Sequence, residues 1–238
     1  DLRIAFEPGV HEQESLLLEI GLKSILLDGR LRFNVAGHYT EYSNLLTQIQ
    51  VEVQGGNILT FSENGGEIDA LGLEVDATYN PIDRLTLSLL ASYLDSEYGT
   101  FGEQNPYQLL NGEVLPFVDV EGETTPWSPE FTTTLGISYE FPLGNAGTLT
   151  SHLQFFYSDE YSTSNLLTPD PNHLQDSFTK TDVRLIWDSP GGEYRVEGFI
   201  ENIEDEGVLA RGNNGGSDLV QTGFLYPRNY GLRVKLRF

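Results

Sequence analysis

Apolar and polar residues alternate with a period of two through most of this chain, and this pattern limits its fold more than any other feature. The final segment, RNYGLRVKLRF, sets leucine, valine and phenylalanine against arginine and lysine in this way. Such alternation is typical of a β-strand with one apolar and one polar face. It predicts about nine strands, at residues 14–26, 30–53, 58–80, 84–99, 130–142, 147–162, 177–189, 193–203 and 226–238. We expect an all-β, antiparallel fold without long helices.

The connections between these strands alternate between tight and long. The tight ones are LLDGR, NPIDR, PLGNAG and SPGGE, and most others run for about ten to thirty residues. Transmembrane β-barrels combine tight periplasmic turns with long outer loops, whereas a soluble sandwich need not sort its loops. Strands of about 10 to 15 residues also suit a tilted membrane crossing. We therefore expect a segment of a transmembrane barrel whose apolar parity faces lipid.

Aromatic residues gather near the ends of the predicted strands, as in the girdles of membrane barrels. The set expected near the tight turns is Tyr139, Phe141, Trp187, Tyr194 and Phe238. The set expected near the long loops is Tyr39, Phe131, Tyr157, Phe178 and Tyr230.

The charge balance excludes some functions. The net charge is -23, and no lysine or arginine lies between Arg84 and Lys180. Nucleic-acid binding requires the opposite sign, so we expect no nucleic-acid partner. The acidity fits either a solvated surface or loops that attract cations. No apolar run approaches the roughly 20 residues of a membrane-spanning helix.

Two loop-like segments supply candidate ligand-binding residues. The segment from Asp95 to Trp127 carries aromatic side chains suited to stacking on sugars or apolar ligands: Tyr98, Phe101, Tyr107, Phe117 and Trp127. Its carboxylates could hold calcium at Asp119, Glu121 and Glu123. The segment ARGNNGGSDL adds Arg211, Asn213 and Asn214 as part of a ligand-capturing loop. The alternatives are a first loop that only packs on its neighbours and a second that is simply mobile.

The four histidines do not indicate a metal or catalytic site. None has a second ligand at a metal-binding spacing on one strand face. His38 and His152 are expected to form hydrogen bonds in the barrel lumen. Ser151 and His152 are adjacent in one strand and so face opposite sides, which argues against a hydrolase. We expect no enzyme activity and no cofactor other than calcium.

Four stretches, in this order, resemble TonB-dependent outer-membrane receptors in the C-terminal half of their barrel. They are ESLLLEIGLKSILLDGRLRFNVAGHYTEYSNL, GGEIDALGLEVDATYNPIDRLTLSLLASYLDSEY, FIENIEDEGV with Asn202 at the matching position, and RNYGLRVKLRF. The resemblance implies a barrel of about 22 strands around an N-terminal plug. Residues 1–238 would be the C-terminal portion, with the plug and the first barrel strands absent.

The resemblance also implies a function and partners. The receptor would take up a scarce ligand, such as iron-siderophore, cobalamin or a saccharide, across the bacterial outer membrane with energy from the TonB complex. Its partners would be outer-membrane lipid and lipopolysaccharide, the rest of the barrel and plug, and the TonB complex. The alternatives are a passive porin-like or surface-interaction barrel and, less favoured, a soluble carbohydrate-binding β-protein. The acidic loops favour a neutral ligand such as a saccharide over a strongly anionic ferric siderophore.

Overall fold

The fold is described from a computed structural model of the chain. It describes residues 10–53, 57–100, 102–103, 118–119, 121–163, 173–214 and 220–237, with the backbone alone at 47–53, 57–63, 102–103, 118–119, 211–214 and 220–221. Within these residues, the one helix whose two ends are both described is a single 3₁₀ turn, η1 (Gly144–Ala146). Among the described residues, no helix has the length and apolar character needed to cross a membrane.

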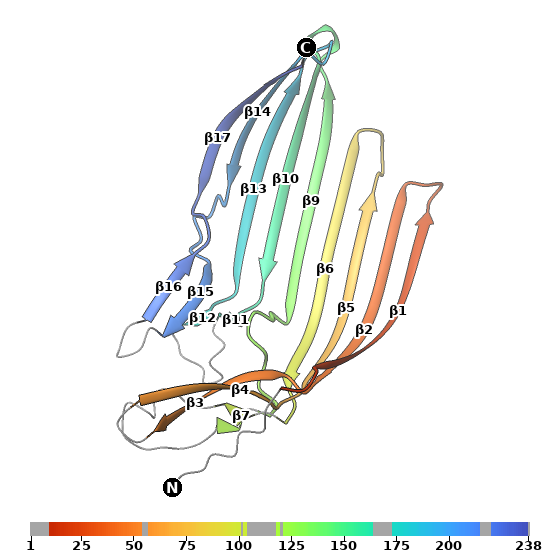
Figure 1. Cartoon of the computed structure of the whole chain (residues 1–238). Coiled ribbons are helices and arrows are strands. Elements are labelled where there is room, and N and C mark those ends of the chain that lie inside the picture. The colour runs from red at the N-terminus through yellow and green to blue at the C-terminus, as the bar shows by residue number, and fades with distance from the viewer. Residues whose placement is uncertain are drawn as a thin grey trace.

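Nine long strands form one antiparallel sheet in which each strand bonds to the next long strand in the chain (Figure 1). In sheet order they are β1 (Glu14–Leu26), β2 (Leu31–Ser43), β5 (Ile68–Tyr79), β6 (Leu85–Tyr98), β9 (Phe131–Pro142), β10 (Thr148–Ser158), β13 (Phe178–Asp188), β14 (Tyr194–Glu201) and β17 (Asn229–Leu236). The prediction of nine antiparallel strands is confirmed. Within the described residues, β1 and β17 each have a strand partner on one side only.

The two ends of this sheet differ, as the sequence predicts. At one end, here called the turn end, the strands are joined by tight turns; Leu27, Asp28 and Gly29 adopt positive φ, and Arg30 N–H donates to Leu27 O at 3.1 Å. The loop end carries four small two-stranded sheets (Figure 1). They pair β3 (Leu46–Val53) with β4 (Asn57–Asn64), β7 (Gly102–Glu103) with β8 (Val118–Asp119), β11 (Tyr161–Ser162) with β12 (Leu174–Gln175), and β15 (Leu209–Asn214) with β16 (Val220–Phe224).

Three predicted strands were too long, and one of them, residues 147–162, runs past the end of β10 into β11, which belongs to a separate small sheet. Residues 30–53 contain β2 and β3, and residues 58–80 contain β4 and β5, because the chain leaves the main sheet at Asn44 and returns at residue 68. Asn44 has a φ of 55°, and Asn64 Nδ2 donates to Asn44 O at 2.8 Å. Strands β3 and β4 therefore form a separate hairpin that extends the loop end.

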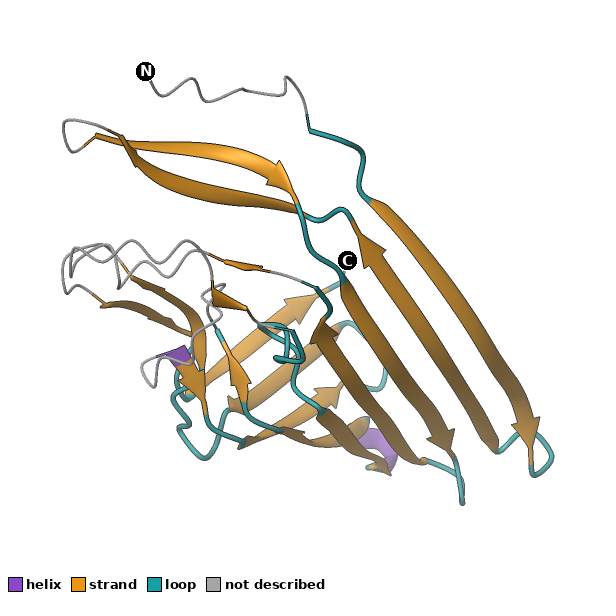
Figure 2. Cartoon of the chain, turned by 90° about the horizontal axis from the view of Figure 1, so that it is seen from below, coloured by secondary structure: helices purple, strands orange, loops and turns teal. Residues whose placement is uncertain are grey.

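The strand register gives the sheet two different faces. Leu73 and Val234 share the face of the exposed apolar residues Leu16, Leu18, Ile20, Leu22, Leu71, Leu135, Ile137, Leu153, Leu185, Leu232 and Leu236. The other face lines a hollow of about 500 Å³ with Glu19, Lys23, Asn34, Glu74 and Asp76. A hollow on a single-layered sheet lies on its concave side, and Figure 2 shows the curvature. The apolar face is therefore convex and the polar face concave.

Aromatic residues border the convex face as expected, with one correction. At the turn end the rings of Tyr139 and Phe141 meet at 4.6 Å between centroids, and at the loop end those of Phe131 and Tyr157 lie 6.2 Å apart. Phe178 is instead on the concave parity, where it is buried. Phe238 lies outside the described residues.

Buried side chains concentrate at the loop end, because the sheet itself is a single layer. We call the largest group the root core; its members are Ser158, Thr163, His173, Gln175, Phe178 and Val208. They come from β10, β12, β13 and the segments next to β11, β12 and β15. The root core fixes the positions of the loops described next.

Candidate functional site

The segment of residues 121–130 folds back on β6 at the loop end. Tyr98 N–H donates to Glu123 O at 2.9 Å, and Thr125 N–H donates to Ser96 O at 3.0 Å. The buried hydroxyls of Ser96 and Thr125 are also hydrogen-bonded, at 2.7 Å. This part of the loop after β6 is thus packed on its neighbours, the alternative that the sequence left open.

One predicted stacking residue, Trp127, is in this folded segment, and another, Tyr98, is on the strand that the segment contacts. Tyr98 is the last residue of β6. Trp127 keeps 47% of its surface exposed, and its backbone N–H donates to Ser162 O at 2.8 Å. The other three candidates, Phe101, Tyr107 and Phe117, lie outside the described residues. Both residues lie at the loop end, where Tyr98 bonds to Glu123 and Trp127 bonds to Ser162.

The calcium prediction stays untested. Glu121 and Glu123 lie in the folded segment, and Asp119 belongs to β8, of which the backbone alone is described. Among the described residues, no group of three His, Asp or Glu side chains is arranged to hold a metal ion.

The predicted glycine- and asparagine-rich loop is partly regular. Arg211, Asn213 and Asn214 belong to β15, whose register with β16 shifts between Leu209 and Arg211. These three residues are thus in a strand of a small hairpin, and neither the mobile nor the ligand-capturing interpretation of the segment is tested by this. The backbone alone is described there, so their prediction as ligand-binding residues stays open.

Sequence reasoning missed the contacts at the base of this β15–β16 hairpin. Leu209 N–H donates to Gln175 Oε1 at 2.6 Å, and Tyr161 Oη–H donates to Leu209 O at 3.4 Å. Burial raises the pKa of the Tyr161 phenol, so the hydroxyl stays protonated and able to donate. No apolar pattern marks Gln175, because a buried glutamine has the same sequence signature as an exposed one.

The segment around Asn202 forms a hydrogen-bonded corner before β15. Asn202 has a φ of 55°, its side chain bonds to both the N–H and the C=O of Glu206, and its own N–H donates to Asp182. Burial opposes ionisation of Glu204, yet the hydrogen bonds from the side chain and N–H of Thr181 lower its pKa overall. This corner explains why the sequence places an asparagine there.

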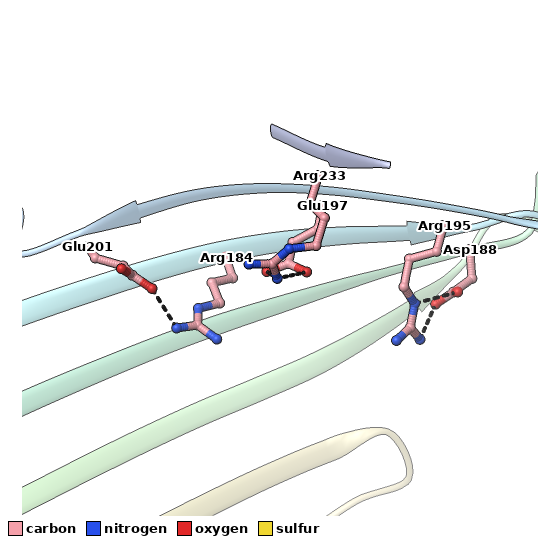
Figure 3. Close-up of polar contacts among 6 residues, drawn as sticks. All are labelled: Arg184, Asp188, Arg195, Glu197, Glu201 and Arg233. Carbon is pink, nitrogen blue, oxygen red and sulfur yellow. Dashed lines mark hydrogen bonds and ion pairs between the residues drawn. The ribbon is translucent and has the colours of Figure 1, made fainter. Parts of the chain in front are cut away.

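The concave face of the last three main strands carries a row of ion pairs (Figure 3). The pairs are Arg184 with Glu201 at 2.7 Å, Arg195 with Asp188 at 2.8 Å, and Arg233 with Glu197 at 3.0 Å. A second hollow, of about 460 Å³, lies at the turn end beside Arg195 and Asp188 and includes His152. Charges in these positions require water or polar partners, so the concave face is not a lipid-facing surface.

The histidines on the main strands have the concave parity expected of lumen-facing side chains, and their hydrogen bonds stay a prediction. His38 is on the concave parity, where a Cβ on Gly72 would come within 2.1 Å of its ring. His152 is opposite Ser138 and Arg184, whereas Ser151 is opposite Tyr139 and Leu185. Neighbours along a strand face opposite sides, so Ser151 and His152 cannot act as a pair.

A sheet that is apolar outside, polar and charged inside, with tight turns at one end and loops at the other, is the wall of an outer-membrane β-barrel. Residues 12–203 match the family model described as TonB dependent receptor-like, beta-barrel. The chain belongs to this family, whose members are transporters of the bacterial outer membrane and not enzymes. The loop end is accordingly extracellular.

Solved structures show the same fold. The ferric yersiniabactin uptake receptor FyuA from Yersinia pestis is 15% identical with a TM-score of 0.70, over 95% of this chain and 30% of that one. The ferric preacinetobactin receptor BauA from Acinetobacter baumannii is 19% identical with a TM-score of 0.65, over 93% and 29%. The copper transporter OprC is 12% identical with a TM-score of 0.68, over 97% and 32%. This chain thus spans less than a third of each of these chains. None of the curated proteins compared with it matches.

Proposed function

We propose that this chain is the C-terminal portion of a TonB-dependent receptor that takes up a scarce ligand across the outer membrane. The observation that carries the proposal is the nine-stranded wall with a charged concave face and, among the described residues, an unpaired strand edge at each side. An open sheet in lipid would leave backbone groups unpaired at several kcal/mol each, so further strands must close it. A barrel of about 22 strands around a plug would pair the backbone groups of both edges and give the charges of the concave face a polar environment.

The partners follow from the two faces. The convex face, with its exposed leucines and aromatic borders, contacts outer-membrane lipid and, toward the loop end, lipopolysaccharide. The concave face contacts the plug and the water around it. The TonB complex would act through the plug and so would not touch this chain directly.

The charge of the loop end bears on the ligand. From Leu85 to Thr179 the sequence has thirteen acidic residues and no basic one. The resulting negative potential disfavours a strongly anionic ligand such as a highly charged ferric siderophore. It favours a neutral ligand such as a saccharide, a cationic one, or one bridged by a divalent ion, for which Asp119, Glu121 and Glu123 are the calcium candidates.

Uptake measurements test the energised mechanism. Cells that express the full receptor are given a panel of labelled iron chelates, cobalamin and oligosaccharides, with and without TonB or a protonophore. We expect uptake of one of these ligands to require both TonB and the proton gradient. Uptake that continues unchanged without them would instead indicate a passive porin-like barrel.

A second measurement tests the charge argument. Ligand binding is measured over a salt series in the full receptor and in a variant whose loop carboxylates are converted to amides at Glu103, Glu113, Asp119, Glu121 and Glu123. We expect an anionic chelate to bind more tightly after neutralisation. Unchanged binding would leave the acids as a solvated surface without a role in selection.

A further inference from the structure

Two side chains of one extracellular loop hold both backbone polar groups of a single residue in the next loop. Gln175 accepts from the Leu209 N–H at 2.6 Å, and Tyr161 donates to the Leu209 carbonyl at 3.4 Å. Tyr161 and Gln175 are cross-strand partners in the β11–β12 hairpin, whereas Leu209 begins β15. The residues are far apart in sequence, so these bonds join two separate loops.

The two side chains are themselves held in place by the root core. Gln175 is buried, and its Nε2 donates to Asp176 O at 2.9 Å. The Tyr161 ring lies 6.5 Å from that of Phe178, which in turn lies 5.7 Å from Phe156 of β10. The β11–β12 hairpin is therefore anchored to the main sheet, and the bonds to Leu209 extend this anchorage.

A third loop joins the same structure. The backbone N–H of Trp127 donates to Ser162 O at 2.8 Å, so the folded segment of residues 121–130 contacts β11 directly. On the other side, Leu225 N–H donates to Val208 O at 2.8 Å and closes the base of the β15–β16 hairpin. A backbone bond thus links the loops after β6 and β10, and the side chains of Gln175 and Tyr161 link the loop after β10 to the loop after β14.

We propose that Tyr161 and Gln175 are positioning residues that clamp Leu209, so that the β11–β12 and β15–β16 hairpins move as one unit at the extracellular mouth. This inference rests on the proposed function, because a receptor that takes up a ligand captures it at the extracellular mouth. The clamp lets contacts made by one loop with a ligand bias the position of the other, because a shared rigid element carries the coupling. Arg211, Asn213 and Asn214 are the ligand candidates carried by the clamped hairpin.

Hydrogen exchange in the full receptor tests the clamp without any ligand. Gln175→Met keeps the side-chain volume but removes the acceptor for Leu209 N–H, and Tyr161→Phe keeps the ring contact with Phe178 but removes the donor. Gln175→Met should speed exchange of peptides covering residues 209–224 by about fivefold, the effect of one ordinary hydrogen bond. Tyr161→Phe should speed it by less, because the 3.4 Å bond that it removes is long and weak. The matched control is Tyr39→Phe, which removes a 2.6 Å bond to Asp69 on a distant pair of strands and should leave these peptides unchanged.

Spin labels separate coupling from a general loss of structure. In the full receptor with other cysteines removed, one label pair replaces Leu185 and Phe224, and another replaces Leu174 and Leu185; all three residues are exposed. In Gln175→Met the distance distribution should broaden for the first pair and stay narrow for the second. If the distance distributions of both label pairs broadened, or if neither did, the proposed clamp would be refuted. Neither readout depends on transport, so a failure of energised uptake would leave this result standing.

Discussion

A charge placed on either face of one strand gives the most direct test of how this wall meets the membrane. Leu73 lies midway along β5, on the convex face opposite Gly37 and Tyr93. Glu74, the next residue, lines the concave hollow with Lys23 and Asp76. The two positions have the same depth and neighbouring backbones, so Leu73→Arg and Glu74→Arg differ chiefly in the side that receives the charge.

The magnitudes follow from the two environments. An arginine facing lipid near the bilayer midplane costs about 2 to 4 kcal/mol, which lowers the ratio of folded to unfolded receptor by about 30- to 900-fold. In the hollow, the Glu74→Arg side chain lies beside Asp76 and water, so we expect a cost below about 1 kcal/mol. We therefore predict the size of each free-energy cost and also that Leu73→Arg costs more than Glu74→Arg.

Urea unfolding of the full receptor in lipid vesicles measures both costs through the shift in midpoint at constant slope. The level of folded receptor in the outer membrane gives an independent check. Equal shifts, or a larger shift for Glu74→Arg, would refute the assignment of the convex face to lipid.

Three further changes test the packing of the concave face and the root core. A Cβ on Gly231 would lie 2.7 Å from Cζ of Phe199, so Gly231→Ala should cost about 1 to 3 kcal/mol in unfolding free energy, whereas Gly198→Ala, with open space around it, should cost almost nothing. Arg233→Met should destabilise the receptor more than Arg184→Met, because the Glu197 side chain is 12% exposed and that of Glu201 is 38% exposed; equal thermal midpoints for the two variants would contradict this. His173 is 1% exposed and neither ring nitrogen has a hydrogen-bond partner among the described residues, so His173→Leu should leave protease resistance of the loop end unchanged or raise it. A marked loss of resistance would show that the imidazole makes a favourable interaction.

The long strands were predictable because each repeats one physical rule over many residues. In β9, for example, Leu135, Ile137 and Tyr139 alternate with Gly136 and Ser138. Lipid on one face of the wall favours the apolar set, and water on the other face favours the small and polar set. The strand ends were less predictable. Alternation continues past Asn44 into β3, so the sequence shows no reason for the chain to leave the sheet there. The break depends on a positive φ and on Asn64, twenty residues away.

The root core could not be predicted for a different reason. Its buried members include a serine, a threonine, a histidine and a glutamine, which pattern analysis assigns to the surface. Their burial depends on hydrogen bonds to residues distant in sequence, such as Thr163 Oγ1 to His173 O at 2.9 Å. The place of Phe178 could have been predicted: it has the parity of Lys180, Asp182 and Arg184 in its own strand, so alternation alone puts it on the polar face and not at the lipid border.

The order of the main sheet determines which parts of such a wall can change independently. Each long strand bonds to the next one along the chain, so an extracellular connection closes only its own pair of strands. Lengthening a flexible connection is inexpensive, at about 0.6 kcal/mol for each doubling. Descendants of one wall can therefore exchange or extend single loops while the strand register stays fixed. The clamp at Leu209 limits this freedom, because the loops after β10 and β14 must then diverge as a pair.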